Sequence, residues 1–346
     1  MLIDRNLQHI TQIMCAVPEK KFPFALQVNS LFTCDEFEGE ILNPDWFSTH
    51  LDRKGLDQVV SSVAIEAIHP AFEPAIETKQ VATNGIFLEC LVSKMDAATI
   101  IFLHGFPDTP INCYKHQIAH FWGKYQIIAP YLRGYGESSQ PESGYDLGTL
   151  AVDIEGLIES KAHIVGHDWG GAIAWTLAQR SPEKVESLTI INGPHPAIYS
   201  KIAYTSAQIF KSWYFLLFQI PCLAEFFLKS CDGIGIRSLI HLWSENQLDA
   251  DNVVEELTAE GVTEAALKYY RTAFHEKEFS EDIVEASTLI IWGLADRCLS
   301  SKNLEGVECY VPDHTLVELE GIGHFPTNED PENINLLLAS FLNQVV

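Results

Sequence analysis

The residues with the clearest chemical meaning surround Asp168. Gly166-His167-Asp168-Trp169-Gly170 follows a short apolar run and precedes a helix-forming run, which is a Gly-x-nucleophile-x-Gly pattern at a strand-to-helix turn. The glycines permit a sharp, strained turn that lifts one side chain above the sheet. A carboxylate in that position attacks carbon by displacement and forms an ester with the enzyme. Because serine is the usual residue there, an aspartate indicates chemistry on epoxides or alkyl halides.

This chemistry also requires a base that activates water and an acid that orients the base. In this kind of hydrolase the nucleophile comes first along the chain, then the acid, then the histidine. After Asp168, the candidate acid is Asp296 and the candidate base is His324. Asp296 follows an apolar run that ends at Gly293, so it lies at the carboxyl end of a predicted strand. His324 lies in the glycine-rich turn 321–325, which is suited to presenting an imidazole. We expect Asp296 to orient His324.

Two backbone N–H groups are the expected donors to the oxyanion. One belongs to Phe106, in the turn His104-Gly105-Phe106-Pro107, and the other to Trp169, immediately after the nucleophile. Two neighbouring histidines are expected to be structural. His104 is predicted to form hydrogen bonds within its own loop, and His167 is predicted to point away from Asp168 at the turn.

A sheet of parallel strands has to hold these residues together at one edge. Continuous apolar runs predict buried strands, and their alternation with helical segments predicts a mostly parallel, doubly wound α/β sheet with helices on both faces. The expected strands lie near residues 85–92, 99–103, 126–129, 162–166, 187–191, 288–293 and 315–319, and the expected helices near 56–68, 151–160, 172–178 and 333–341.

The alternation of strands and helices is interrupted after residue 195. The segment 196–285 is mostly helical in pattern and rich in aromatic residues, and strand signals resume beyond it. We therefore predict a core in two parts, 80–195 and 286–346, with a helical cap, 196–285, inserted between them. Residues 1–79 form an N-terminal extension of unknown role.

Composition restricts the possible partners. The chain has 346 residues, a hydrophobic content of 47% and a net charge of −25, from 47 acidic and 22 basic residues. The apolar content allows a sizeable core, whereas the negative charge argues against nucleic acid and anionic membranes as partners. No expectation follows for the oligomeric state.

The cysteines and the targeting signals favour a cytoplasmic protein. The 8 cysteines are scattered without a Cys-x-x-Cys pair, so neither a zinc site nor a disulfide framework is indicated, and free thiols fit a reducing compartment. The first residues show no signal peptide. The most apolar stretch, 213–221, is shorter than the roughly 20 residues that span a bilayer, so we expect it to be a helix under a protein surface.

Six motifs follow one another along the chain from about residue 80 to its end. They are His104-Gly105-Phe106-Pro107, Arg133-Gly134-Tyr135-Gly136-Glu137-Ser138, Gly166-His167-Asp168-Trp169-Gly170-Gly171, Asn192-x-Pro194-His195-Pro196, Trp292-Gly293-x-x-Asp296 and Gly323-His324-Phe325. Together they resemble the motifs of the epoxide hydrolases of the α/β-hydrolase superfamily, the soluble epoxide hydrolase-like group. The resemblance implies an α/β-hydrolase fold with an inserted helical cap. One departure is Tyr131, where the family commonly has aspartate, and the N-terminal extension carries no resemblance.

The resemblance also implies two cap tyrosines that hold and protonate the epoxide oxygen. It places Tyr214 and Tyr270 in these roles, with Tyr269 as the main competitor for the second and Tyr199 and Tyr204 as weaker candidates. A phenol with an ordinary pKa of about 10 can donate its proton as an alkoxide develops. The aromatic residues around Tyr214 suggest an apolar pocket, namely Trp213, Phe215, Phe218, Phe226 and Phe227.

The favoured hypothesis is an epoxide hydrolase that forms an ester on Asp168 and releases a vicinal diol after His324 activates water. It requires no metal or organic cofactor, and its expected partners are a small, neutral, apolar epoxide and water. One alternative is a haloalkane-type dehalogenase with the same triad, in which Trp169 donates its indole N–H to the halide, although the side chain of Phe106 cannot serve as the second donor. The other alternative is a non-catalytic ligand binder on the same fold.

Overall fold

The computed structural model describes residues 76–203, 205–246, 248, 250–276 and 279–345. These residues belong to one compact unit that spans Phe72–Val346. The expected N-terminal extension, with its predicted helix near residues 56–68, therefore lies outside the described residues, except for its last residues, which begin a strand.

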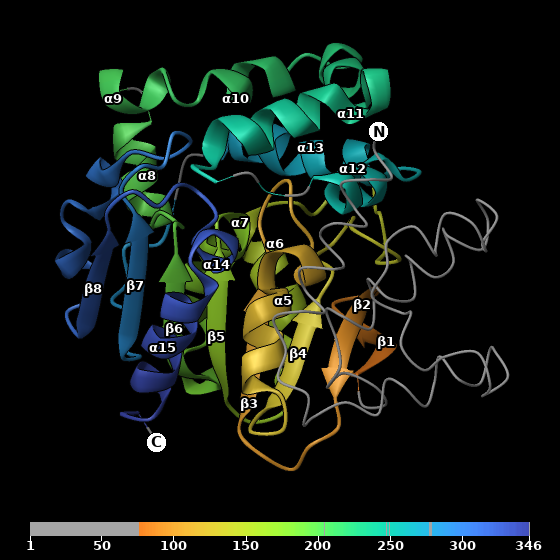
Figure 1. Ribbon diagram of the computed structural model, residues 1–346. Helices are drawn as coiled ribbons and strands as arrows, with labels where there is room; N and C mark the ends of the chain where they lie inside the picture. The colour runs from red at the N-terminus through yellow and green to blue at the C-terminus, as the bar shows by residue number, and fades with distance from the viewer. Residues whose placement is uncertain (1–75, 204, 247, 249, 277–278, 346) are drawn as a thin grey trace, which may run out of the picture. The chain divides into compact units, whose positions relative to one another are not determined.

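An eight-stranded sheet forms the centre, in the order β1-β2-β4-β3-β5-β6-β7-β8 (Figure 1). The pairs β1–β2 and β2–β4 are antiparallel, and every pair from β4 to β8 is parallel. This order confirms the mostly parallel α/β sheet, although β1 was not predicted. The strands are β1 (Ile76–Thr83), β2 (Ile86–Ser93), β3 (Thr99–Leu103), β4 (Gln126–Pro130), β5 (Ala162–His167), β6 (Val185–Ile191), β7 (Thr288–Gly293) and β8 (His314–Leu319).

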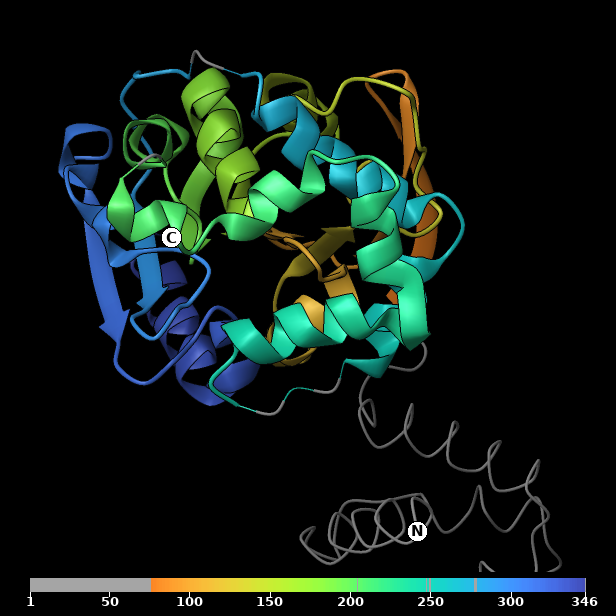
Figure 2. The ribbon, with the colours of Figure 1, turned by 90° about the horizontal axis from the view of Figure 1, so that it is seen from above.

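Helices cover both faces of the sheet, which explains why the central strands are apolar throughout. Every residue of β5 and β7 is buried, as expected for parallel strands packed on two sides. Helices α5, α14 and α15 lie on one face and α6 and α7 on the other (Figures 1 and 2). Their bounds are α5 (Pro110–Phe121), α6 (Leu147–Glu155), α7 (Trp169–Arg180), α14 (Pro326–Glu329) and α15 (Pro331–Leu342), with 3-10 turns at Pro182–Lys184, Ser301–Leu304 and Val307–Cys309.

Helix α6 corrects the helix expected at 151–160. It begins earlier because Asp146 caps it: the Asp146 carboxylate accepts a hydrogen bond from the backbone N–H of Thr149 at 2.9 Å. It ends at Glu155, and Gly156 follows. A Cβ atom on Gly156 would lie only 2.1 Å from the hydroxyl oxygen of Thr83, so the chain needs glycine where it passes β1.

Among the residues that the structure describes between β6 and β7, six helices stand over the carboxyl edge of the parallel strands (Figure 1). We call them the inserted helices. Among the described residues, no helix is long and apolar enough to cross a membrane. The inserted helices are α8 (Pro196–Ile202), α9 (Ser206–Ile209), α10 (Trp213–Phe218), α11 (Leu223–Trp243, kinked near residues 230–233), α12 (Asp251–Thr258) and α13 (Val262–Ala273).

A buried ion pair ties the loop after β4 to α6, and a hydrogen bond ties the same loop to the inserted helices. The guanidinium of Arg133 donates to both carboxylate oxygens of Asp153 at 2.7 Å each, and the two side chains are only 5% and 2% exposed. Such bidentate pairs are strong and directional. The hydroxyl of Tyr269 in α13 donates to the backbone oxygen of Arg133 at 2.8 Å, so the same loop also anchors α13.

Candidate active site

Asp168 stands at the turn between β5 and α7 with strained backbone geometry. Its φ is 51° and its ψ is −117°, a conformation that a residue with a side chain rarely adopts. Glycines make this turn possible because other atoms crowd it. A Cβ atom on Gly105 would lie 2.4 Å from the Cβ of Asp168, and one on Gly170 would lie 2.0 Å from the backbone oxygen of Leu103. The sequence pattern therefore forms the sharp turn expected of it.

The two carboxylate oxygens of Asp168 have different environments. Oδ1 accepts a hydrogen bond from the backbone N–H of Phe106 at 2.9 Å. Oδ2 lies 3.6 Å from Nε2 of His324. Trp169 begins α7, where the backbone N–H groups of the first turn lack intrahelical acceptors and the helix dipole favours negative charge. One oxygen is thus held by a donor, and the other faces the imidazole.

The carboxylate of Asp296 accepts several hydrogen bonds. Its Oδ1 accepts hydrogen bonds from the backbone N–H groups of Cys298 at 2.6 Å and Leu299 at 2.8 Å. Its Oδ2 accepts one from the side-chain amide of Asn192 at 2.7 Å and lies 2.8 Å from Nδ1 of His324. Burial raises the pKa of the Asp296 carboxyl, but His324 and the other donors outweigh burial and hold it below its usual value. Asp296 is therefore an ionised carboxylate in a fixed orientation.

His324 lies between two carboxylates and is fully buried. Its Nδ1 faces Asp296, and its Nε2 faces Asp168. Burial lowers the pKa of His324, but the carboxylates, Asp296 foremost, raise it to about 10. The structure thus brings together the three residues that the sequence placed in the order nucleophile, acid and histidine, and at rest it holds the imidazole in its charged form.

Two further histidines support the site from outside, as expected. His104 lies 3.0 Å from the backbone oxygen of Gly105 through Nδ1, and its Nε2 accepts from the backbone N–H of Leu132 at 3.1 Å. Nε2 of His167 donates to the backbone oxygen of His324 at 2.7 Å. Burial lowers the pKa of both imidazoles to about 4. Both imidazoles are therefore neutral, and their hydrogen bonds to backbone groups fit the structural role predicted for each.

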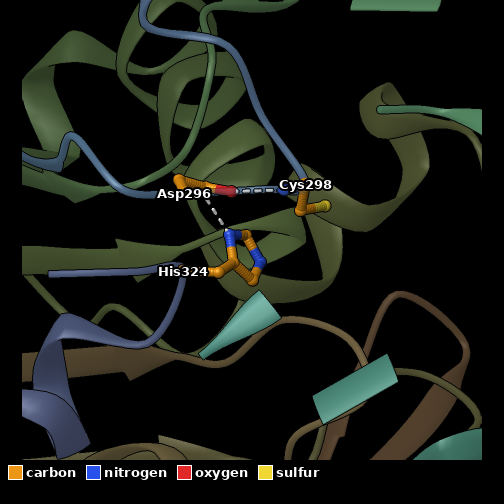
Figure 3. Close-up of side chains that lie close together, drawn as sticks. All are labelled: Asp296, Cys298 and His324. Atoms are coloured by element: carbon orange, nitrogen blue, oxygen red, sulfur yellow. Dashed lines mark hydrogen bonds and ion pairs between the residues drawn. The ribbon is translucent and has the colours of Figure 1, made fainter. Parts of the chain in front are cut away.

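Cys298 brings a third group with metal-binding capacity beside Asp296 and His324, within 4.8 Å of both (Figure 3). The sequence did not single out this thiol. Each oxygen of Asp296 already serves two hydrogen-bond donors, so a metal ion would have to displace several of them. The arrangement suits a carboxylate that orients an imidazole better than a metal cage.

The structure separates Tyr269 from Tyr270. The hydroxyl of Tyr269 donates a hydrogen bond to the loop after β4. The ring of Tyr270 instead lies 5.2 Å from that of Trp169 and 5.3 Å from that of Phe106. The ring of Tyr214 lies 5.9 Å from that of Tyr270. Burial, reinforced by Asp168 among other groups, raises the pKa of both Tyr214 and Tyr270. Both phenols therefore keep their protons at neutral pH.

The weaker tyrosine candidates and part of the aromatic lining lie elsewhere. The hydroxyl of Tyr199 lies 3.2 Å from that of Ser212, and Tyr204 lies outside the described residues. Trp213 is 42% exposed and Phe226 is 69% exposed, so the expectation that they line the pocket is wrong. Trp213 lies on the outer side of α10 and Phe226 on the outer side of α11, so both side chains point to solvent. Of the other aromatic residues expected there, Phe215 and Phe218 contact the ring of Tyr270, and Phe227 is half-buried.

Sequence reasoning missed the contribution of Asn192. The sequence placed this residue in a motif but assigned it no role. In the structure Asn192 has a φ of 39°, donates to Asp296 and accepts from the backbone N–H of Gly293 at 2.8 Å. The signal was present, since a polar residue at the carboxyl end of a buried strand, next to the strand that carries the acid, lies at the correct edge of the sheet.

Known proteins resemble this chain over most of its length. Residues 98–225 match the family described as alpha/beta hydrolase fold. The chain is 31% identical over 265 residues to mouse epoxide hydrolase 4, covering 71% of this chain and 73% of that protein. It is 34% identical over 286 residues to AB hydrolase superfamily protein YfhM of Bacillus subtilis, covering 77% and 98%.

Solved structures of epoxide hydrolases are also similar to this chain. A variant of an epoxide hydrolase from Bacillus megaterium, complexed with a naphthyloxy-propane-1,2-diol product, has a TM-score of 0.69 and 31% identity, covering 77% of this chain and 100% of that chain. An epoxide hydrolase found in metagenomes from hot environments has a TM-score of 0.70 and 32% identity, covering 77% and 98%. The sheet, the turn at Asp168 and these similarities lead to one conclusion: the chain belongs to the epoxide hydrolase family of the α/β-hydrolase superfamily.

Proposed function

We propose that the protein hydrolyses a small, neutral, apolar epoxide to a vicinal diol through an ester on Asp168. One observation carries the proposal: a donor holds one oxygen of Asp168, while the other oxygen faces a histidine that is oriented by a second carboxylate. The names of the relatives and the diol bound to the Bacillus megaterium enzyme support this substrate class. No metal or organic cofactor takes part in this scheme.

In the first step, Oδ2 of Asp168 attacks a carbon of the epoxide ring. A carbon–oxygen bond to the enzyme forms, and one ring bond breaks. The ring oxygen takes a proton from the phenol of Tyr214 or Tyr270, which becomes a phenolate. The ester carries no charge, so the attraction that kept His324 protonated weakens. His324 returns a proton to the phenolate through water and becomes a neutral base.

In the second step, water attacks Cγ of Asp168 while Nε2 of His324 accepts one of its protons. Negative charge develops on Oδ1, which the N–H groups of Phe106 and Trp169 stabilise. The tetrahedral intermediate collapses with cleavage of the bond between Cγ and Oδ2. The remaining proton from water passes to the leaving alkoxide. The diol departs, and Asp168 is again a carboxylate that now holds one oxygen atom from water.

We propose that the segment 196–285, which contains the inserted helices, acts as the cap of a core formed by residues 80–195 and 286–346. Tyr214 and Tyr270 both come from this segment, whereas the triad comes from the core. The cap thus brings the proton donors to the nucleophile. Cap residues therefore determine which epoxides fit.

Variants separate the two steps. Asp168→Ala is expected to abolish diol formation from a styrene-oxide-type substrate. His324→Gln is expected to accumulate protein whose mass exceeds the unmodified mass by that of the substrate. His314→Gln, which alters a histidine outside the site, is the matched control and should turn over normally. Diol formation at the wild-type rate by either site variant contradicts the proposal.

A single turnover in water labelled with heavy oxygen tests the ester directly. The label is expected to enter Asp168 first, because the diol takes its second oxygen from the carboxylate. Label found directly in the diol excludes the ester. Halide release from haloalkanes without diol formation would instead favour the dehalogenase, and tight binding of an unreacted ligand would favour the binder.

A further inference from the structure

Cys298 touches both halves of the proposed machinery. Its Sγ lies 3.0 Å from the hydroxyl of Tyr214, and its backbone N–H donates to Asp296 at 2.6 Å. The cysteine is only 1% exposed and the tyrosine 2%. Figure 3 shows the thiol on the loop that carries the acid, beside the imidazole of His324. A core thiol and a phenol of the inserted helices therefore meet inside the site.

The direction of this hydrogen bond decides its effect. A phenol has one proton, and its oxygen can accept a bond from another donor. When Tyr214 gives its proton to the oxygen of a substrate, it has no proton for sulfur, so the thiol must be the donor. Burial and the nearby carboxylates raise the pKa of Cys298 well above its ordinary value. The S–H group is thus present at neutral pH and available to Tyr214.

We propose that Cys298 is a positioning residue for epoxide opening, which donates its S–H to the oxygen of Tyr214 while the phenol proton moves to the epoxide oxygen. The inference rests on the epoxide chemistry proposed above. As Tyr214 becomes a phenolate, this bond becomes charge-assisted and strengthens. The thiol therefore lowers the barrier of the first step and leaves the hydrolysis of the ester unchanged.

The test measures the two steps separately in the full-length protein. Quenched single turnovers followed by mass spectrometry give the rate at which the ester forms and the rate at which it disappears. Cys298→Ala is expected to slow ester formation roughly 10- to 100-fold, the effect of losing a hydrogen bond to a charged group, and to leave ester hydrolysis unchanged. Cys298→Ser keeps a donor and should restore ester formation to within a few-fold of wild type.

Three further variants exclude a purely structural role. Cys298→Val fills the space of the thiol but donates no hydrogen bond. It should slow ester formation as much as Cys298→Ala does, which shows that the cavity left by alanine is not the cause. Cys90→Ala removes a buried thiol outside the site and should change neither rate. In a Tyr214→Phe background, Cys298→Ala should have no further effect on ester formation, because the two residues act through one bond.

The outcomes are distinct. Two outcomes overturn the inference directly: a normal rate of ester formation in Cys298→Val, or an additive effect of Cys298→Ala in the Tyr214→Phe background. Equal slowing of ester formation and ester hydrolysis also overturns it, because the thiol would then act through Asp296. If the wild-type protein forms no ester with any epoxide, it is the proposed function that fails.

Discussion

The protonation of His324 should depend strongly on the charge of Asp168, and this dependence can be measured without catalysis. Nε2 of His324 lies 3.6 Å from the carboxylate. Two unit charges about 4 Å apart interact by about 4 kcal/mol at an effective dielectric constant of about 20. Since about 1.4 kcal/mol corresponds to a factor of ten, neutralising Asp168 should lower the proton affinity of His324 roughly a thousandfold.

Asp168→Asn mimics the neutral ester with little change in shape. The pKa of His324 is raised to about 10 in the wild-type protein, so the imidazole should stay protonated well above neutral pH. In the variant the titration midpoint should move down by about three pH units. Ester formation would then convert a cation into a base that is active near neutral pH, where general bases work best.

Histidine-labelled protein gives the titration by nuclear magnetic resonance. The protein has 13 histidines, and the signal that disappears in His324→Gln identifies the relevant one. Intact mass confirms that residue 168 remains an amide. Asp313→Asn, a carboxylate ahead of β8, is the matched control and should leave the midpoint in place. An unchanged midpoint in Asp168→Asn would show that Asp296 alone sets the charge of His324 and that Asp168 does not influence it.

Four other substitutions test the geometry. Tyr270→Phe should slow ester formation at least roughly tenfold. Tyr269→Phe should mainly lower the melting temperature, because its hydroxyl donates to the loop after β4. Single turnovers and thermal scans distinguish the two variants. Gly105→Ala should nearly abolish diol formation in a steady-state assay, because its Cβ would lie 2.4 Å from the nucleophile's Cβ. Arg133→Met should cost about 3–5 kcal/mol in chemical denaturation, since it leaves the Asp153 carboxylate buried and unpaired.

The turn at Asp168 was predictable because its requirements are local. A strand, a strained residue and a helix follow one another within a few positions, and the glycines mark where the backbone passes close to its neighbours. The parallel sheet was predictable for a similar reason, since strands buried on both faces are continuously apolar. β1 escaped prediction because it is an edge strand whose residues are mostly exposed and polar, so it lacks that signature.

Contacts between distant residues were harder to predict. Asn192 and Asp296 are 104 positions apart, and no local pattern states that their side chains meet. Only the neighbouring places of β6 and β7 in the sheet bring them together. The contact between Cys298 and Tyr214 joins two elements whose relative placement depends on how the inserted helices dock. Sequence patterns indicate such elements separately but not the distance between them.

The orientation of side chains in the inserted helices was also beyond the sequence. Helix α10 has only 6 residues, nearly all of them apolar, so no polar face identifies its inner side. Trp213 and Tyr214 are adjacent, and adjacent helical residues point about 100° apart. One is half-exposed and the other is buried. The same rotation distinguishes Tyr269 from Tyr270, which only the docked structure could separate.

How well each part of the site could be predicted depends on which element carries it. In the proposed mechanism, the groups that make and break the ester lie on the strands of the sheet and the turns that follow them, where local sequence patterns indicate their positions. The groups proposed to protonate the epoxide oxygen lie on the inserted helices, where packing against the sheet decides which phenol faces Asp168. Cys298 joins the two, because it lies on a core loop and touches a phenol of the inserted helices. Changes in substrate preference should therefore arise mainly in the inserted helices and at their contacts with the core, while the triad stays constant.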